Sequence, residues 1–106
     1  MRLRVISDYG EIERIVAEEA TPEIVKNTMR SLDLQGFHQV VLDRPNGDWM
    51  EVGGSLDPGD GLSVMYEENG KQFVIKVPPT GIDEMTAMLL GYMSSTDDWK
   101  KGAEWE

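Results

Sequence analysis

The alternation of apolar and polar positions along the chain predicts a protein built mainly of short strands. A period of two places successive side chains on opposite faces of a sheet. The expected strands, rich in β-branched or aromatic residues, cover 3–6, 37–42, 49–52, 62–66 and 73–77. The connections within the last four are too short for crossover helices, so these strands predict an antiparallel meander.

The segment 11–19 fits two kinds of secondary structure. Its two isoleucines and Val16 fall on one helical face, whereas residues 14–17 also fit a strand that closes a hairpin with the first strand. We favour the strand, because a clear helix start follows at once at Thr21.

Two helices are predicted from their N-terminal signals. Thr21 offers a capping hydroxyl before Pro22 at the first helical position, and Gly36 is the expected stop. Thr80, followed three residues later by Asp83, predicts a capping box for the second helix. Apolar residues recur at helical spacing after each start: Ile24, Val25, Thr28, Met29 and Leu32 in the first helix, and Ile82, Met85, Leu89 and Met93 in the second. The expected fold is one α+β domain over residues 1–106, a mainly antiparallel β-sheet of five or six strands with two α-helices.

The charge of the chain is strongly negative and unevenly distributed. Twenty acidic residues against ten basic ones give the 106 residues a formal net charge of −10. Residues 43–69 hold seven acids and one arginine, and so carry six of the ten excess negative charges. The seven are Asp43, Asp48, Glu51, Asp57, Asp60, Glu67 and Glu68. Solubility alone would explain negative charge, but uniform solubilising charge would not concentrate in this way.

Such a charge favours basic partners and disfavours nucleic acids and anionic membranes. The basic residues are scattered among acids, so we expect no direct nucleic-acid binding. The longest apolar run, 87–93, is far shorter than the roughly 20 residues of a membrane span. Residues 1–8 lack the apolar stretch of a signal peptide, and the chain has no cysteine. We therefore expect a cytoplasmic protein that does not associate with membranes.

No motif in the chain points to catalysis, a metal or a cofactor. His38 is the single histidine, and the sequence gives it neither a nucleophile nor an orienting group. The loop 57–61 lacks the alternating acids and the final glutamate of a calcium loop, and it reads as a turn. Gly53 and Gly54 follow a strand but open no helix, as a phosphate loop requires. We expect no enzyme activity, no metal and no cofactor.

The three tryptophans are candidates for packing or for binding. Trp49 opens a strand and is either a core residue or an exposed anchor. Trp99 and Trp105 lie in a polar C-terminal tail, where they either pin the tail to the domain or anchor an interface.

From Thr21 to Trp105 the order of features resembles a known group of proteins. The matching features are the helix that begins at Pro22 and ends at Leu32-Asp33, then Val40-Val41-Leu42, Val52-Gly53-Gly54, Gly61-Leu62-Ser63-Val64, Pro78-Pro79-Thr80, Tyr92, Trp99 and Trp105. In this order they resemble the small immunity proteins of bacterial polymorphic-toxin systems, in the group often encoded beside deaminase-fold toxins. The resemblance implies a toxin inhibitor in interbacterial competition, which binds one cognate toxin and occludes its active site. It transfers no catalytic or toxin-contacting residue by position.

Residues and resemblance together predict a protein–protein interaction with a cognate toxin that is basic at its active site. The expected contact residues are Asp43, Asp48, Trp49, Asp57, Asp60, Glu67, Glu68, Asp97, Asp98 and Trp99. Two alternatives stay open at this point: a secretion adaptor or chaperone that recognises an effector protein, and a small enzyme that uses paired carboxylates.

Overall fold

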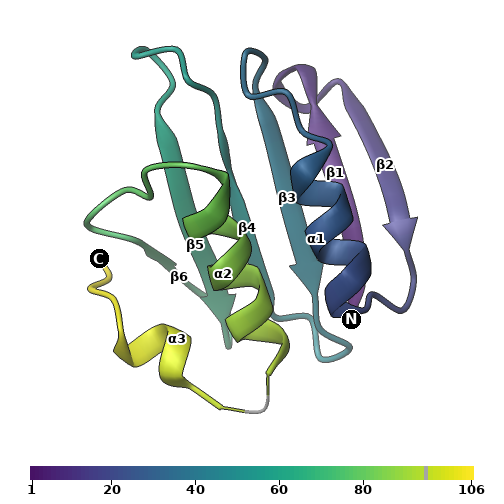
Figure 1. Cartoon of the computed structure of the whole chain (residues 1–106). Coiled ribbons are helices and arrows are strands. Elements are labelled where there is room, and N and C mark those ends of the chain that lie inside the picture. The colour runs from purple at the N-terminus through teal and green to yellow at the C-terminus, as the bar shows by residue number, and fades with distance from the viewer. Residues whose placement is uncertain (95) are drawn as a thin grey trace.

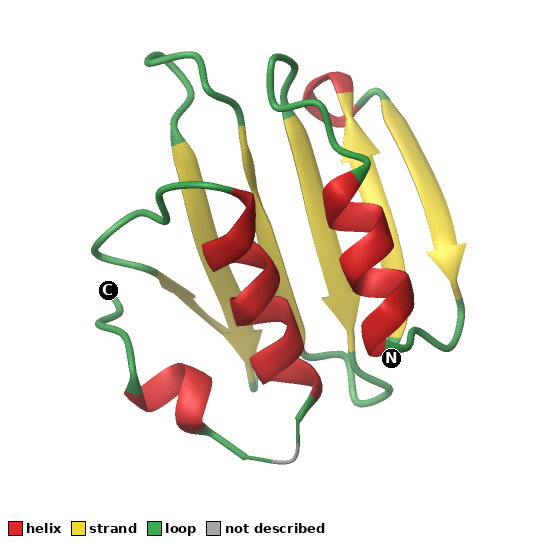
Figure 2. Ribbon diagram, viewed as in Figure 1, coloured by secondary structure: helices red, strands yellow, loops and turns green. Residues whose placement is uncertain are grey.

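The protein is a two-layer structure in which one six-stranded antiparallel sheet is covered on one face by helices (Figures 1 and 2). The computed structural model describes residues 1–94 and 96–106. The strands are β1 (Arg2–Ser7), β2 (Ile12–Ala17), β3 (His38–Asp43), β4 (Trp49–Gly54), β5 (Leu62–Glu68) and β6 (Lys71–Val74), in the order β2-β1-β3-β4-β5-β6. The helices are α1 (Pro22–Arg30), α2 (Ile82–Met93) and the short α3 (Asp98–Lys101), and a 3-10 turn, η1 (Asp8–Gly10), joins β1 to β2.

The α+β prediction is confirmed, including the uncertain second strand. β2 pairs antiparallel with β1, as the hairpin interpretation of 11–19 required. β3, β4, β5 and β6 follow one another as a meander. The β1–β2 hairpin joins this meander through the β1–β3 pairing, which brings residues 2–7 beside residues 38–43.

The core lies between the sheet and the two long helices. The fully buried residues on the covered face of the sheet are Leu3, Val40, Leu42, Met50, Val52 and Val64, and those of the helices are Val25, Met29, Met85, Leu89 and Tyr92. These buried residues recur at every second position in the strands and at every third or fourth position in the helices, because only those periods keep one face of the element toward the core.

One predicted helix cap is present and the other is wrong. The Thr21 hydroxyl accepts a hydrogen bond from the backbone N–H of Ile24, at 3.2 Å. The second helix has Gly81, not Thr80, at its cap, and no side chain among the described residues forms a cap bond there. Because the helix begins one residue later than predicted, Glu84 instead of Asp83 occupies the third position, and its carboxylate accepts a hydrogen bond from the N–H of Thr80 at 2.7 Å. The first helix also ends earlier than predicted, at Arg30 instead of near Gly36.

The C-terminal tail is tied to the edge of the sheet and to the core. Backbone hydrogen bonds join Val74 to Glu106 and Lys76 to Glu104, so the tail runs beside the end of β6. The predicted strand through residue 77 is therefore shorter, and Ile75 forms an isolated bridge with Trp105. Trp99 and Trp105 both meet the ring of Tyr66 edge-on, with centroids 5.0 and 4.7 Å away.

Candidate functional site

The face of the sheet opposite α1 and α2 is covered by no helix among the described residues (Figure 1). Strand pairing fixes which side chains share this face, here called the open face. Its rows across the strands are Glu13-Ile6-Gln39-Gly53-Ser63, then Ile15-Arg4-Val41-Glu51-Met65-Val74, and then Arg2-Asp43-Trp49-Glu67-Gln72. An uncovered sheet face that mixes large apolar, aromatic and charged residues has the composition of a binding surface.

The centre of the open face is sealed by its own side chains, and the charged residues Arg4 and Glu51 lie on either side of Val41. Val41 is 1% exposed yet lies outside the main core cluster, because neighbours on the open face cover it. Trp49 is half-buried on the same face, so it is not a core residue of the helix-covered side. Ile15 at the edge is 50% exposed. The structure thus resolves the ambiguity about Trp49 toward a surface position.

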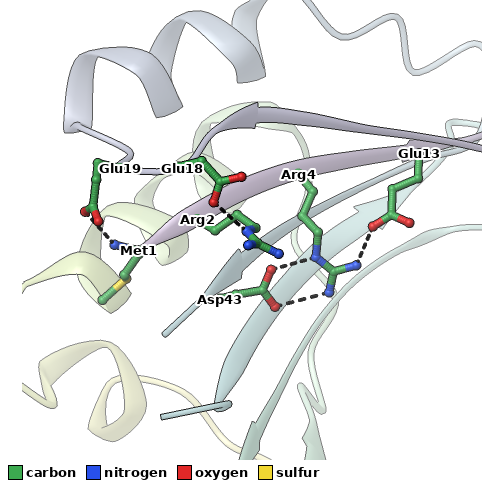
Figure 3. A network of polar contacts seen from close by, with 7 residues as sticks. All are labelled: Met1, Arg2, Arg4, Glu13, Glu18, Glu19 and Asp43. Carbon is green, nitrogen blue, oxygen red and sulfur yellow. Dashed lines mark hydrogen bonds and ion pairs between the residues drawn. The ribbon is translucent and has the colours of Figure 1, made fainter. Parts of the chain in front are cut away.

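The β1–β2 side of the open face is neutralised by ion pairs (Figure 3). Arg4 donates two hydrogen bonds to Asp43, at 2.6 and 3.1 Å, and a third to Glu13 at 2.8 Å. Arg2 pairs with Glu18 at 3.0 Å. The hydrogen bonds to Asp43, and to a smaller extent the one to Glu13, raise the pKa of Arg4. Its positive charge therefore persists at any physiological pH. The hollow above this network has a volume of about 520 Å³, and the carboxylates of the network that line it are already paired with arginines of the same protein.

The predicted contact acids fall at opposite ends of the sheet. Asp57 and Asp60 lie in the β4–β5 loop at one end, beside η1. Asp48 lies at the other end, where its carboxylate accepts a hydrogen bond from the N–H of Asn69 in the β5–β6 turn. A strand of six residues at about 3.3 Å each separates the two ends by roughly 20 Å. The acids therefore do not form one cluster.

Several of these acids are engaged within the protein. Glu68 pairs with Lys100 at 2.7 Å, and Asp43 is held by Arg4 as described above. Asp57 accepts a hydrogen bond from the N–H of Gly59, which shapes its loop. Glu67 lies on the open face and accepts a hydrogen bond from the Gln72 amide at 3.3 Å, without an ion pair among the described residues.

The predicted contacts of α3 separate into exposed acids and a buried aromatic. Asp97 and Asp98 are exposed at the start of the helix. Trp99 is 7% exposed, and a Cβ on Gly91 of α2 would lie 2.8 Å from its Cβ, so the helix backbone approaches it closely. In this structure the ring of Trp99 faces the core and pins the tail, the packing alternative that the sequence left open, and its contact with a partner stays a prediction.

A strained turn presents an aromatic residue beside the acidic loop. Asp8 and Tyr9 have φ angles of 52° and 56°, which L-residues rarely adopt. The Tyr9 ring is 71% exposed and stacks on Phe37 with centroids 4.6 Å apart. Its hydroxyl donates to Asp60 at 2.9 Å, and this hydrogen bond raises the pKa of Tyr9. Such strain concentrates at functional positions.

Next to this turn, a groove crosses the open face where β4 has no side chain. It has a volume of about 210 Å³ and is lined by Phe37, Gln39, Glu51, Gly53, Asp60 and Met65, among others. Burial raises the pKa of Glu51, while the Gln39 amide and the positive charge of Arg4 act in the opposite direction. A carboxylate that is partly shielded from water and has no close cation favours the binding of a positively charged group.

Glu51 is one of the seven acids in 43–69, but neither it nor Tyr9 or Phe37 is predicted from the sequence as a site residue. The alternation in β4 does place Trp49 and Glu51 on one face, and this signal could have paired them. The contact of Tyr9 with Phe37 joins residues far apart in the chain, and no local pattern predicts it.

Comparison of the chain with protein-family models, curated proteins and solved structures finds no match. Within the part of the chain that the structure describes, no helix is long and apolar enough to cross a membrane. The same residues contain no group of three or more His, Cys, Asp or Glu side chains that could hold a metal ion.

Proposed function

We propose that this protein is an immunity protein, which binds a folded bacterial toxin domain that is basic around its active site and blocks that site. The observation that carries the proposal is the uncovered sheet face, on which Trp49, Glu51 and Glu67 lie on neighbouring strands. Trp49 can serve as an aromatic anchor, and Glu51 and Glu67 form no ion pair with a described residue. This combination suits a basic protein surface better than a small molecule or a nucleic acid.

The distribution of charge supports a binding process in which different residues control the association rate and the dissociation rate. The acids at both ends of the sheet and the net charge of −10 speed the approach of a basic partner, and this effect weakens in salt. Trp49 and its neighbours on the open face then supply the contacts that determine how slowly the complex dissociates. Toxins that act on nucleic acids carry basic substrate-binding surfaces, so covering such a surface with this face would exclude the substrate.

The first test is capture of the partner from lysate of the native cells, washed at high salt and identified by mass spectrometry. High salt removes non-specific charge attraction and leaves partners held by a buried interface. The captured domain is then expressed in cells with and without this protein. Toxicity that this protein relieves, together with a one-to-one complex of the purified chains, is the expected result.

Other outcomes would contradict the proposal. Capture of many effector proteins, bound through extended segments, would favour a secretion adaptor or chaperone. Failure of this protein to relieve the toxicity of a captured domain would remove the immunity function even if the two proteins bind.

The contribution of the loop acids can be measured separately by reversing Asp57 and Asp60 to Lys. We expect the association rate at low salt to fall by about tenfold or more, with a smaller change in the dissociation rate. A second variant reverses Asp97 and Asp98 at the other end of the molecule, and the two association rates together rank the two ends as encounter surfaces. Circular dichroism of both variants checks that the fold is retained. An association rate equal to that of the wild type would exclude the 57–60 loop from the encounter.

A further inference from the structure

The groove over Gly53 has the size and the lining of a receptor for one side chain. Its volume of about 210 Å³ is below the roughly 300 Å³ at which small-molecule pockets begin. Gly53 forms its floor, because neighbouring strands leave no room for a side chain there: a Cβ would clash with the carbonyl oxygen of His38. Gln39 and Ser63 lie directly across the sheet on either side of this glycine.

The walls of the groove combine negative charge with aromatic and thioether surface. Glu51 stands on β4 two residues from the glycine floor and directly opposite Met65 of β5. Phe37 and Asp60 lie on the rim, where the stacked ring and the hydroxyl of Tyr9 hold them together. A cation with an aliphatic stem suits such a site, since the stem packs on Met65 and the charge meets the carboxylates and the ring.

Among the residues that the structure describes, no lysine or arginine lines this groove. Arg4 belongs to the same row of side chains as Glu51 but lies two strands away, about 10 Å at the usual strand spacing. Its guanidinium is already engaged by Asp43 and Glu13. The Asp60 carboxylate accepts hydrogen bonds from Tyr9 and Ser55, which fix its position without neutralising its charge.

We propose that this groove receives the side chain of a lysine or arginine from the partner, which packs over Gly53 and pairs with Glu51. The inference rests on the proposed function, because the cation belongs to the toxin. It places the centre of the complex on the β4–β5 part of the open face, next to Tyr9, and it makes Glu51 the residue that distinguishes a basic partner from a neutral one.

A small-molecule probe tests the groove without the partner. Isotope-labelled protein is titrated with Nα-acetyl-argininamide, Nα-acetyl-lysinamide and the neutral isostere Nα-acetyl-citrullinamide, and followed by NMR. We expect saturable, millimolar binding of one or both cationic probes, with shifts centred on the amides of Gly53, Gly54 and Gly61. Citrullinamide should give no such shifts. Equal shifts with citrullinamide, or shifts spread evenly over all exposed acids, would overturn the proposal.

Two substitutions define the role of Glu51. Glu51→Gln keeps the shape of the groove and should abolish the probe shifts, whereas Glu23→Gln, an exposed acid on α1, should leave them unchanged. Met65→Lys places an ammonium directly opposite Glu51 and should fill the groove from within, with the same loss of binding. Retained probe binding in Glu51→Gln would refute the site.

The captured toxin domain then distinguishes the two proposals. In its complex, Glu51→Gln should weaken affinity by about tenfold or more, mainly through faster dissociation, while Glu23→Gln has no effect. An unchanged affinity in Glu51→Gln would overturn the groove inference and leave the immunity function standing. Cation binding at the groove in a protein that protects against no toxin would refute the immunity function alone.

Discussion

Replacing Tyr92 with phenylalanine should preserve the fold and make it less sensitive to alkali. Tyr92 is 1% exposed, and the Arg44 guanidinium lies 3.9 Å from the centre of its ring, a contact that phenylalanine keeps. The ring also meets Trp99 edge-on, with centroids 5.3 Å apart. Its hydroxyl has no hydrogen-bond partner among the described residues. The substitution therefore removes a buried polar group without leaving another one unpaired, and stability at neutral pH should stay equal or rise by up to about 1–2 kcal/mol.

The alkaline effect follows from the pKa of the same hydroxyl. Burial raises the pKa of Tyr92 from 10.0 to about 12, with the positive charge of Arg44 opposing the shift. Between these two values the unfolded chain has released the proton and the folded protein has kept it, so stability falls as pH rises. At about 1.4 kcal/mol per pH unit, the wild type should lose about 2–3 kcal/mol across the window from this group.

Urea unfolding, followed by circular dichroism at neutral pH and at points within that window, measures both effects. Tyr92→Phe should lose less stability than the wild type as the pH rises. Tyr9→Phe is the matched control, because solvent screens the exposed hydroxyl of Tyr9 and its removal should change the pH dependence little. Parallel loss of stability in the wild type and in Tyr92→Phe would refute the assignment of this alkaline sensitivity to Tyr92.

Four further predictions concern the tail and the helix starts. Trp99→Ala should lower the free energy of unfolding by about 3–5 kcal/mol in urea titrations, and a loss below about 1 kcal/mol would show that the ring is not a core residue. Trp105→Phe removes the hydrogen bond from its indole to the carbonyl of Lys100, 2.9 Å long, and should cost about 1 kcal/mol and speed amide exchange in the tail. Thr21→Ala should cost about 1 kcal/mol, because its hydroxyl caps α1. Thr80→Ala should leave the melting temperature nearly unchanged, since that hydroxyl caps no helix.

The strands were predictable because the alternation of apolar and polar residues is a local signal. Which face of the sheet the helices cover was not predictable. In β3 the run from Val40 to Leu42 is apolar on both faces, and all three residues are at most 1% exposed. Alternation therefore cannot say which side the helices occupy. The start of α2 was missed by one residue for a similar reason, since Thr80 and Gly81 are both plausible caps and packing of the following apolar stripe selects the second.

The electrostatic character of the candidate site was predictable in sign but not in detail. The sequence shows how many acids lie in 43–69, yet their internal cations come from distant segments. Arg4 reaches Asp43 across 39 positions, and Lys100 reaches Glu68 across 32. Only the fold reveals that these two acids are matched, and that no cation in the described part of the chain lines the groove beside Glu51.

The size of the open face decides how much more of the surface a stable complex must use. Six strands spaced about 4.8 Å apart and about 20 Å long give a face of roughly 480 Å². A stable complex buries about 800 Å² of accessible surface on each partner, so we expect the toxin also to contact turns beyond the sheet. At the end that holds Asp48, the neighbouring acids Asp43 and Glu68 are matched internally. At the end that holds Asp60, the groove and the exposed Tyr9 adjoin the loop. Reversing Asp57 and Asp60 should therefore slow association more than reversing Asp97 and Asp98, and the opposite ranking would place the toxin at the other end of the molecule.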